Sequence, residues 1–349
     1  MRRRLQALAF AIAVLAALEA VLRAMVPPEE LLFSYERPNS VLMLDSDKKT
    51  YLPRPLAQDV VPDGPNYWRY RMNAAGLRAD KEFPRERPAG TVRYLALGDS
   101  WIWGQTTDQS LTLEAQLETI LASSLHKPVE VLDAGVPGGG AYDMLVRWRA
   151  LRDRWQLDGL VLGAPKNIGR QKAVGAERAV WLGGGAPYLN LYLYLGLRRL
   201  VIPYTRSGLR DFDDATWGTA LDDTMTLAKE ARAAGLDVVL GMWPATRDQA
   251  IAGDPVVPYS RFSDALTPLG VRVTGARLAS SACWGFEDHT HPSESGYRVL
   301  AEILAERLTT GSDPGGLRTQ PRCEDVPGSG PTKPAPPRSR AQAEATRVP

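Results

Sequence analysis

Val92-Arg-Tyr-Leu-Ala-Leu-Gly-Asp-Ser100 is the stretch that decides the fold of this 349-residue chain. Its first six residues are mostly apolar, as in a short buried strand, and Gly98 and Asp99 end the run abruptly. A serine directly after such a strand and before a helical pattern is typical of a strand-to-helix turn that exposes the hydroxyl. The segment is therefore taken as the first strand of an α/β domain.

Strand-like and helix-like segments alternate after Ser100. Apolar residues at helical spacing between Leu111 and Leu125 predict the first helix. Alternation of this kind is typical of a parallel sheet with helices on both faces. The chain is therefore predicted to form a three-layer α/β/α sandwich around a central, mostly parallel five-stranded sheet. The predicted strands cover residues 92–97, 129–132, 159–162, 237–242 and 271–274, and the remaining helices residues 141–155, 217–234 and 294–308.

Composition shifts divide the chain into four parts. Residues 1–26 are predicted to be a signal anchor, 27–90 a stem with a hairpin-like lead-in, and 91–310 the α/β domain. Residues 311–349 are rich in Pro, Gly, Ser and Arg and are predicted to be disordered. Within the domain, residues 171–209 interrupt the alternation with an apolar and aromatic stretch. A helical insertion or lid and additional core are both compatible with it.

The N-terminal segment indicates export. Residues 2–4 are arginines, and a mostly apolar run follows from Leu5 to Val26. Its length approaches the roughly 20 residues needed to span a bilayer. Because Leu18 and Glu19 stand where a small-residue cleavage site would be expected, we favour an uncleaved anchor with the body outside the cytoplasm. A cleaved signal peptide is the alternative.

Charge and scarce residue types limit the function further. A net charge of +2 gives no sign of a nucleic-acid surface, and three histidines argue against a multi-histidine metal site. Cys283 and Cys323 are the two cysteines. In an exported chain they can pair, which would tie the tail to the loop before Asp288. Two unrelated thiols are the alternative.

The segment Asp288-His-Thr-His291-Pro292 offers a base for Ser100. A carboxylate three residues before a histidine, on a turn, can reach its Nδ1 and leave Nε2 free to take a hydroxyl proton. His289 competes for the role of base. Its side chain should point away from that of His291, so we favour His291, with Asp288 as its support.

An ester-cleaving serine also needs donors for the oxyanion. Gly138 follows the second predicted strand and Asn167 follows the third, and the Ser100 backbone N–H faces the same space. A turn glycine and a helix cap are the plainer explanations for Gly138 and Asn167. Trp101 and Trp103 are candidates for stacking on a sugar ring, although packing of the following helix is favoured.

In this order the residues resemble the SGNH/GDSL hydrolase superfamily, whose blocks carry Ser, Gly, Asn and His. Gly98-Asp-Ser100 resembles the first block and Asp133-Ala-Gly-Val-Pro-Gly138 the second. Asn167 falls in the third, and Asp288 with His291 in the last. The resemblance covers about residues 70–308 and implies a flavodoxin-like fold. The lead-in and the anchor are similar to those of a bacterial membrane-associated branch.

Two blocks depart from the family pattern. The second usually begins with asparagine, where this chain has Asp133. The third usually reads Gly-x-Asn-Asp, where this chain has Ala164-Pro-Lys-Asn-Ile-Gly169. The missing aspartate and the added Lys166 change the polarity of the expected pocket, so Lys166 joins Trp101 as a candidate substrate contact.

The resemblance implies an extracytoplasmic serine esterase with Ser100, Asp288 and His291 as a triad. It would act on acyl esters, including O-acetyl groups of envelope polysaccharide, without a metal or organic cofactor. The membrane, through the N-terminal helix, is the other expected partner, and nucleic acid is not. An O-acetyltransferase using the same triad and an inactive glycan-binding scaffold are the alternatives. The sequence predicts no oligomeric state.

Overall fold

The computed structural model describes residues 2–25, 41–45, 50–63, 66–163, 214–244, 250–251, 259–284, 290–310, 317–320 and 323. Several predictions fall outside these residues. They concern Lys166, Asn167, Asp288 and His289, the insertion at residues 171–209, and most of the C-terminal tail.

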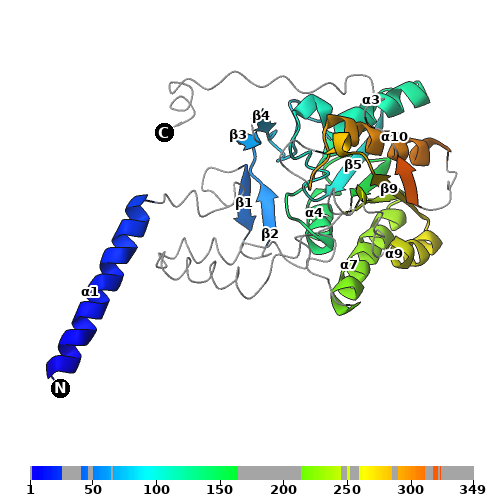
Figure 1. Ribbon diagram of the computed structural model, residues 1–349. Helices are drawn as coiled ribbons and strands as arrows, with labels where there is room; N and C mark the ends of the chain where they lie inside the picture. The colour runs from blue at the N-terminus through cyan, green and yellow to red at the C-terminus, as the bar shows by residue number, and fades with distance from the viewer. Residues whose placement is uncertain are drawn as a thin grey trace.

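A six-stranded sheet forms the centre of the α/β domain (Figure 1). The strand order is β10-β9-β8-β7-β5-β6, and every neighbouring pair is parallel. The five predicted strands are confirmed, with β9 extending further than expected. The strands are β5 (Val92–Gly98), β6 (Val129–Asp133), β7 (Gly159–Gly163), β8 (Asp237–Met242), β9 (Val271–Leu278) and β10 (Leu317–Gln320).

Strand β10 corrects the prediction of five strands, and it lies in the segment that composition assigned to a disordered tail. Its four residues pair with β9 from Gly275 to Leu278. A strand this short carries too few residues to show a period, so sequence pattern cannot detect it. Pairing with β9 satisfies backbone groups that an edge strand would otherwise expose.

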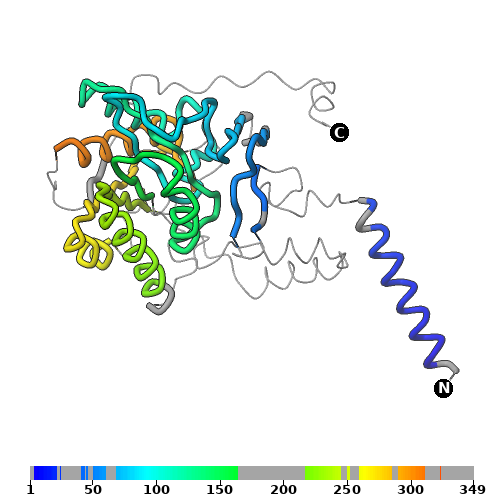
Figure 2. Tube along the Cα trace, turned by 180° about the vertical axis from the view of Figure 1, so that it is seen from behind, coloured from blue at the N-terminus to red at the C-terminus, as the bar shows by residue number. Residues whose placement is uncertain are grey.

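Helices cover both faces of the sheet. One face carries α3 (Leu113–Leu125) and α10 (Glu294–Thr310), and the other α4 (Ala141–Leu151), α7 (Asp214–Ala233) and α9 (Tyr259–Leu266). The two views agree on this division (Figures 1 and 2). In β5, Tyr94 and Ala96 pack in the core between the sheet and helices α3 and α10, and Leu95 and Leu97 pack in the core on the opposite face. Because this strand is buried on both faces, its residues form an unbroken apolar run.

The order of the five strands from β6 to β9 is the flavodoxin-like 2-1-3-4-5. From β5 the chain turns to β6 on one side, then returns and crosses to β7 on the other. In open parallel sheets, ligands bind beyond the carboxyl ends of the strands at this switch point. Ser100 follows β5 by two residues, so the fold places it there.

The lead-in forms two antiparallel hairpins. They pair β1 (Leu42–Asp45) with β2 (Thr50–Pro53) and β3 (Gln58–Asp63) with β4 (Asn66–Arg71). Their buried side chains form a third core that includes Trp103 and Val136 of the α/β domain. The lead-in is therefore packed against the loops that follow β5 and β6. Its contributors to this core are Val41, Leu42, Tyr51, Trp68, Tyr70 and Met72.

The N-terminal segment is a single helix, α1 (Arg2–Met25). By length and composition, its stretch Arg4–Val21 is long and apolar enough to cross a membrane. No part of that stretch is buried in the portion of the chain that the structure describes. An exposed apolar helix of this length fits a membrane span or a signal sequence.

Candidate active site

Ser100 lies in a hydrogen-bonded turn directly after β5. The Asp99 carboxylate accepts the Trp101 N–H at 2.9 Å, and the Asp99 carbonyl accepts the Trp103 N–H at 2.9 Å. The Ser100 carbonyl accepts the Gln105 N–H at 3.0 Å. These bonds fix the backbone on both sides of the serine and therefore the direction of its hydroxyl.

Two paired glycines bring this turn down onto the sheet. Gly98 of β5 is the register partner of Gly163 of β7, and the Ile102 side chain packs over both. A Cβ at either glycine would lie 2.4 Å from the Ile102 Cγ1 atom, too close for any larger residue. The missing side chains let Ile102 seat the turn across the ends of the two strands at the switch point.

The His291 imidazole reaches Ser100 from the segment that precedes α10. Its Nε2 lies 2.7 Å from the Ser100 Oγ, although the two residues are 191 positions apart. The residues are 5% and 3% exposed, respectively. The Nδ1 atom lies 3.2 Å from the Thr290 Oγ1. The structure thus brings two members of the predicted triad together, and the third, Asp288, lies outside the described residues.

Trp101 fixes the histidine segment rather than facing a ligand. Its indole N–H donates to the Thr290 carbonyl at 2.9 Å, and its ring stacks on Trp243 and meets Trp284 edge-on. The Trp101 side chain is 0% exposed, so it offers no face for stacking a sugar. The candidate role in substrate binding is therefore corrected, because Trp101 links the serine turn to the residue before His291.

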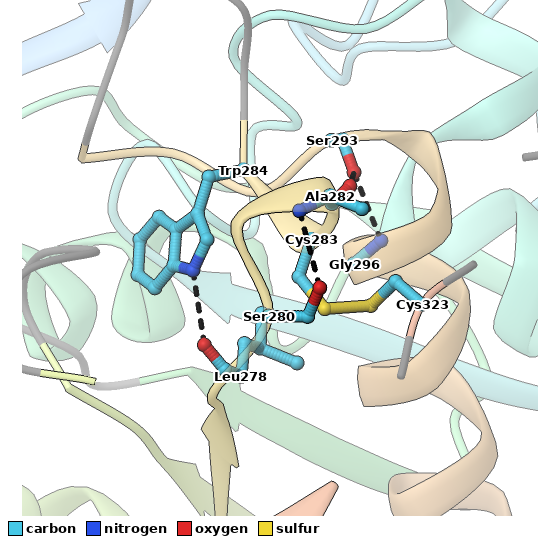
Figure 3. The surroundings of a disulfide bond; sticks show 8 residues. All are labelled: Leu278, Ser280, Ala282, Cys283, Trp284, Ser293, Gly296 and Cys323. Carbon is cyan, nitrogen blue, oxygen red and sulfur yellow. Dashed lines mark hydrogen bonds between the residues drawn. A yellow bond between two sulfur atoms is a disulfide. The ribbon is translucent and has the colours of Figure 1, made fainter. Parts of the chain in front are cut away.

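A disulfide bond holds the other end of the histidine segment (Figure 3). Cys283, after β9, is joined to Cys323, which follows β10. The Cys283 carbonyl accepts the Ser293 N–H at 2.8 Å, and the Ser293 hydroxyl donates to the Ala282 carbonyl at 2.7 Å. Next to these contacts, Trp284 forms an antiparallel bridge with Pro292, the residue after His291. The bond thus connects the sheet edge to the segment carrying the candidate base.

We expect Cys323→Ser to lower the free energy of unfolding by about 4 kcal/mol, because the disulfide closes a loop of 40 residues in the unfolded chain. Thermal unfolding by circular dichroism measures the loss. As a control, a reductant should lower the midpoint of the wild type to that of the variant and leave the variant unchanged. A wild type insensitive to reductant, with an equally stable variant, would contradict the pairing.

Gly138 lies in a type II turn after β6. The Val136 carbonyl accepts the Gly139 N–H at 2.8 Å, Pro137 occupies the second position, and Gly138 has φ 75°. A positive φ at the third position of this turn favours glycine. The Val136 N–H donates to the Gly98 carbonyl at 3.0 Å, which holds the turn against the end of β5.

The backbone N–H groups of Ser100 and Gly138 are the two candidate oxyanion donors that lie within the described residues. Within the described part of the chain, neither the Ser100 N–H nor the Gly138 N–H donates a hydrogen bond to another residue. The third candidate, the Asn167 side chain, lies outside the described residues. Backbone N–H groups held in fixed turns and left unbonded are suited to receive a developing negative charge.

A buried pair of acids lies behind the Gly138 turn. The Asp133 carboxylate accepts the Gly135 N–H at 2.9 Å. Burial raises the pKa of Asp133 to about 7, against the opposing effects of Arg78, this N–H and Arg147. Burial, and then the Asp133 charge, raise the pKa of Glu114 well above its usual value. The pair therefore retains a proton near neutral pH. Asp133 is visible in the sequence as a departure from the family pattern, whereas Glu114 cannot be found there, because burial of a polar helix residue leaves no sequence signal.

No family model matches the chain, and no curated protein matches its sequence. Similar solved structures include the psychrotrophic esterase EstA from Pseudoalteromonas sp., with a TM-score of 0.41 and 12% identity over 63% of this chain and 97% of that one. TesA has a TM-score of 0.41 and 17% identity over 62% of this chain and 98% of that one. AlinE4, an SGNH-hydrolase family esterase, has a TM-score of 0.36 and 16% identity over 65% of this chain and 99% of that one. The strand order and parallel pairing of this chain establish its fold.

Proposed function

We propose that this chain is a serine hydrolase of the SGNH type that cleaves acyl esters. One observation carries the proposal: the His291 Nε2 lies 2.7 Å from the Ser100 Oγ at the switch point of a flavodoxin-like sheet. A serine hydroxyl is a weak nucleophile unless a base removes its proton, and this separation is within hydrogen-bond reach. The Ser100 and Gly138 N–H groups, which donate to no other residue in the described part of the chain, supply the accompanying anion site.

In the proposed mechanism, His291 Nε2 takes the proton of the Ser100 hydroxyl as Oγ attacks the ester carbonyl carbon. The carbonyl oxygen becomes an oxyanion that accepts hydrogen bonds from the Ser100 and Gly138 N–H groups and the Asn167 side chain. Collapse breaks the bond to the alcohol, which leaves with the proton from His291. Water, deprotonated by the same imidazole, then releases the acid and frees Ser100.

Asp288 is proposed to accept a hydrogen bond from the protonated Nδ1 of His291. This arrangement keeps Nε2 available as the base and stabilises the imidazolium that forms. The Thr290 hydroxyl, 3.2 Å from Nδ1, is a second possible acceptor on the same side of the ring. The proposal therefore assigns Nδ1 as the protonated nitrogen in the resting state.

The catalytic domain is proposed to lie outside the cytoplasm, held at the membrane by α1. Two observations support this location: the uncovered apolar helix Arg4–Val21 and the disulfide between Cys283 and Cys323. Structural disulfides persist in oxidising compartments and are rare in the cytosol. Acyl esters at the cell surface, including O-acetyl groups on envelope polysaccharide, are the proposed substrates because that is where the domain would meet them.

Labelling with a fluorophosphonate probe tests the proposal on the full-length chain in detergent micelles. We expect the wild type to be labelled and Ser100→Ala to lose all labelling, since only an activated serine reacts at an appreciable rate. Ser124→Ala, which alters an exposed serine on α3, is the matched control and should be labelled like the wild type. A folded wild type that resists the probe would remove the esterase proposal in favour of a glycan-binding scaffold.

A further inference from the structure

The loop that follows Ser100 contains little regular structure, yet its backbone is held in unusual conformations. Between β5 and α3 the described elements include only the 3-10 turn η2 (Gln109–Leu111). Thr106 has φ 67° and is 5% exposed, and Gly104 has φ 70°. A non-glycine residue at positive φ is retained only where its surroundings hold it there. Something outside the loop must therefore fix its shape.

Arg78 of the lead-in supplies that support. Its guanidinium donates to the carbonyls of Trp103, Gly104 and Thr107, at 2.6 Å for the last two, and its Nε donates to the Gln109 side chain at 3.0 Å. The residue is 1% exposed. The guanidinium group is planar and rigid, so its hydrogen bonds to three carbonyls of one loop fix the positions of those carbonyls relative to one another.

Contacts from β6, from the loop and from the lead-in fix Arg78 itself. Its N–H donates to the Asp133 carbonyl at 3.2 Å, and the Gln109 side-chain amide donates back to the Arg78 carbonyl at 2.9 Å. The guanidinium carbon lies 4.5 Å from the centre of the Tyr70 ring. These contacts to the backbone, to a side chain and to an aromatic ring hold the Arg78 guanidinium in one position.

The loop connects this support to both halves of the candidate catalytic pair. On one side, the Gln105 N–H donates to the Ser100 carbonyl at 3.0 Å. On the other, the Thr106 hydroxyl donates to the Pro292 carbonyl at 3.2 Å, and the Tyr297 hydroxyl of α10 donates to the Gln105 carbonyl at 2.9 Å. Pro292 follows His291 directly. A shift of the loop would therefore move Ser100 and the His291 segment relative to each other.

We propose that Arg78 is a positioning residue for the Ser100–His291 pair, acting through the loop of residues 103–109. The lead-in is then part of the active-site framework and not a spacer between the membrane helix and the enzyme. The inference rests on the proposed function, since it concerns the geometry of the same pair. Positioning of this kind has large kinetic effects, because a displacement of about 1 Å can cost about 100-fold in rate.

Arg78→Lys is the decisive variant. Lysine keeps the positive charge beside the buried Asp133 and Glu114 but cannot reproduce the fork that reaches three carbonyls. We expect the second-order rate constant for fluorophosphonate labelling of the full-length chain to fall about 100-fold. Arg93→Lys is the matched control. Arg93 is equally buried and also donates to two carbonyls, but it lies near the opposite end of β5, so labelling should stay at the wild-type rate.

The NMR signal of the His291 ring provides a second measurement, which reports on the position of the ring and does not depend on catalysis. The chain has three histidines, so the NMR signal of the His291 ring can be assigned with a His291→Asn variant. We expect Arg78→Lys to shift that signal and Arg93→Lys to leave it in place. An unshifted His291 signal in folded Arg78→Lys overturns the positioning role whether or not the wild type reacts with the probe. A wild type that does not react contradicts the esterase proposal alone.

Gln109→Met covers the case in which Arg78→Lys does not fold. Gln109 is half-buried, and its replacement by methionine is a milder change. It removes the acceptor of the Arg78 Nε–H and the donor to the Arg78 carbonyl. The expected result is a smaller decrease in labelling rate and a smaller shift of the His291 signal in the same directions. Wild-type values for both measurements in folded Gln109→Met would overturn the inference.

Discussion

His291→Asn should reduce the rate of ester hydrolysis by about 10⁴-fold or more, with little change in stability. The reason is the 2.7 Å contact between Nε2 and the Ser100 Oγ, which an asparagine amide cannot replace as a proton acceptor. Loss of the base from such a pair typically leaves only the contribution of binding and the oxyanion donors, about 10³- to 10⁴-fold over water. Turnover of p-nitrophenyl acetate measures the effect, with thermal unfolding to confirm the fold.

The other two histidines provide matched controls for this result. His126→Asn alters an exposed residue at the end of α3 with φ 50°, a conformation that asparagine tolerates. His289→Asn removes the base that the sequence alone left in competition. Both should hydrolyse the ester at nearly the wild-type rate. A loss confined to His289→Asn would transfer the role of base to that residue.

Asp133→Asn should stabilise the folded chain by about 4 kcal/mol at pH 8.5 and have little effect at pH 4. Burial raises the pKa of Asp133 from its usual 3.8 to about 7, and each unit corresponds to about 1.4 kcal/mol. Asparagine is the residue that usually stands here in the superfamily that the sequence resembles. Its side-chain oxygen can still accept the Gly135 N–H, so the turn before Gly138 keeps its support.

The sign of this pH dependence follows from proton binding. Because the folded-state pKa is the higher one, the folded chain holds the Asp133 proton more tightly than the unfolded chain does. The free energy of unfolding of the wild type therefore falls as pH rises from about 4 to about 7. Urea unfolding at several pH values measures the slope, which should flatten in Asp133→Asn. Asp153→Asn, at an exposed position, should leave the slope unchanged, and a wild-type slope in Asp133→Asn would refute the assignment.

The sequence determined the elements of the α/β domain because their signal is local. A strand buried on both faces, such as β5, must be apolar along its length, and the chain shows this without reference to any other segment. The same holds for the amphipathic pattern of α3 and for the abrupt end of β5 before Ser100. The predicted order of strands and helices then restricted the fold to a parallel sheet with covered faces. Ser100 and His291 could be proposed from turns in that pattern.

Tertiary structure decided the features that depend on distant segments meeting. The 2.7 Å separation of Ser100 and His291 results from the positions of β5 and α10 in the sandwich, and no local pattern encodes a contact across 191 residues. Strand β10 forms by parallel backbone pairing with the edge of β9, a contact between segments that are distant in the sequence. From the sequence alone, Arg78 would be predicted to be an ordinary exposed charge. Its burial follows from three loop carbonyls that converge on it, and that convergence is a property of the folded chain alone.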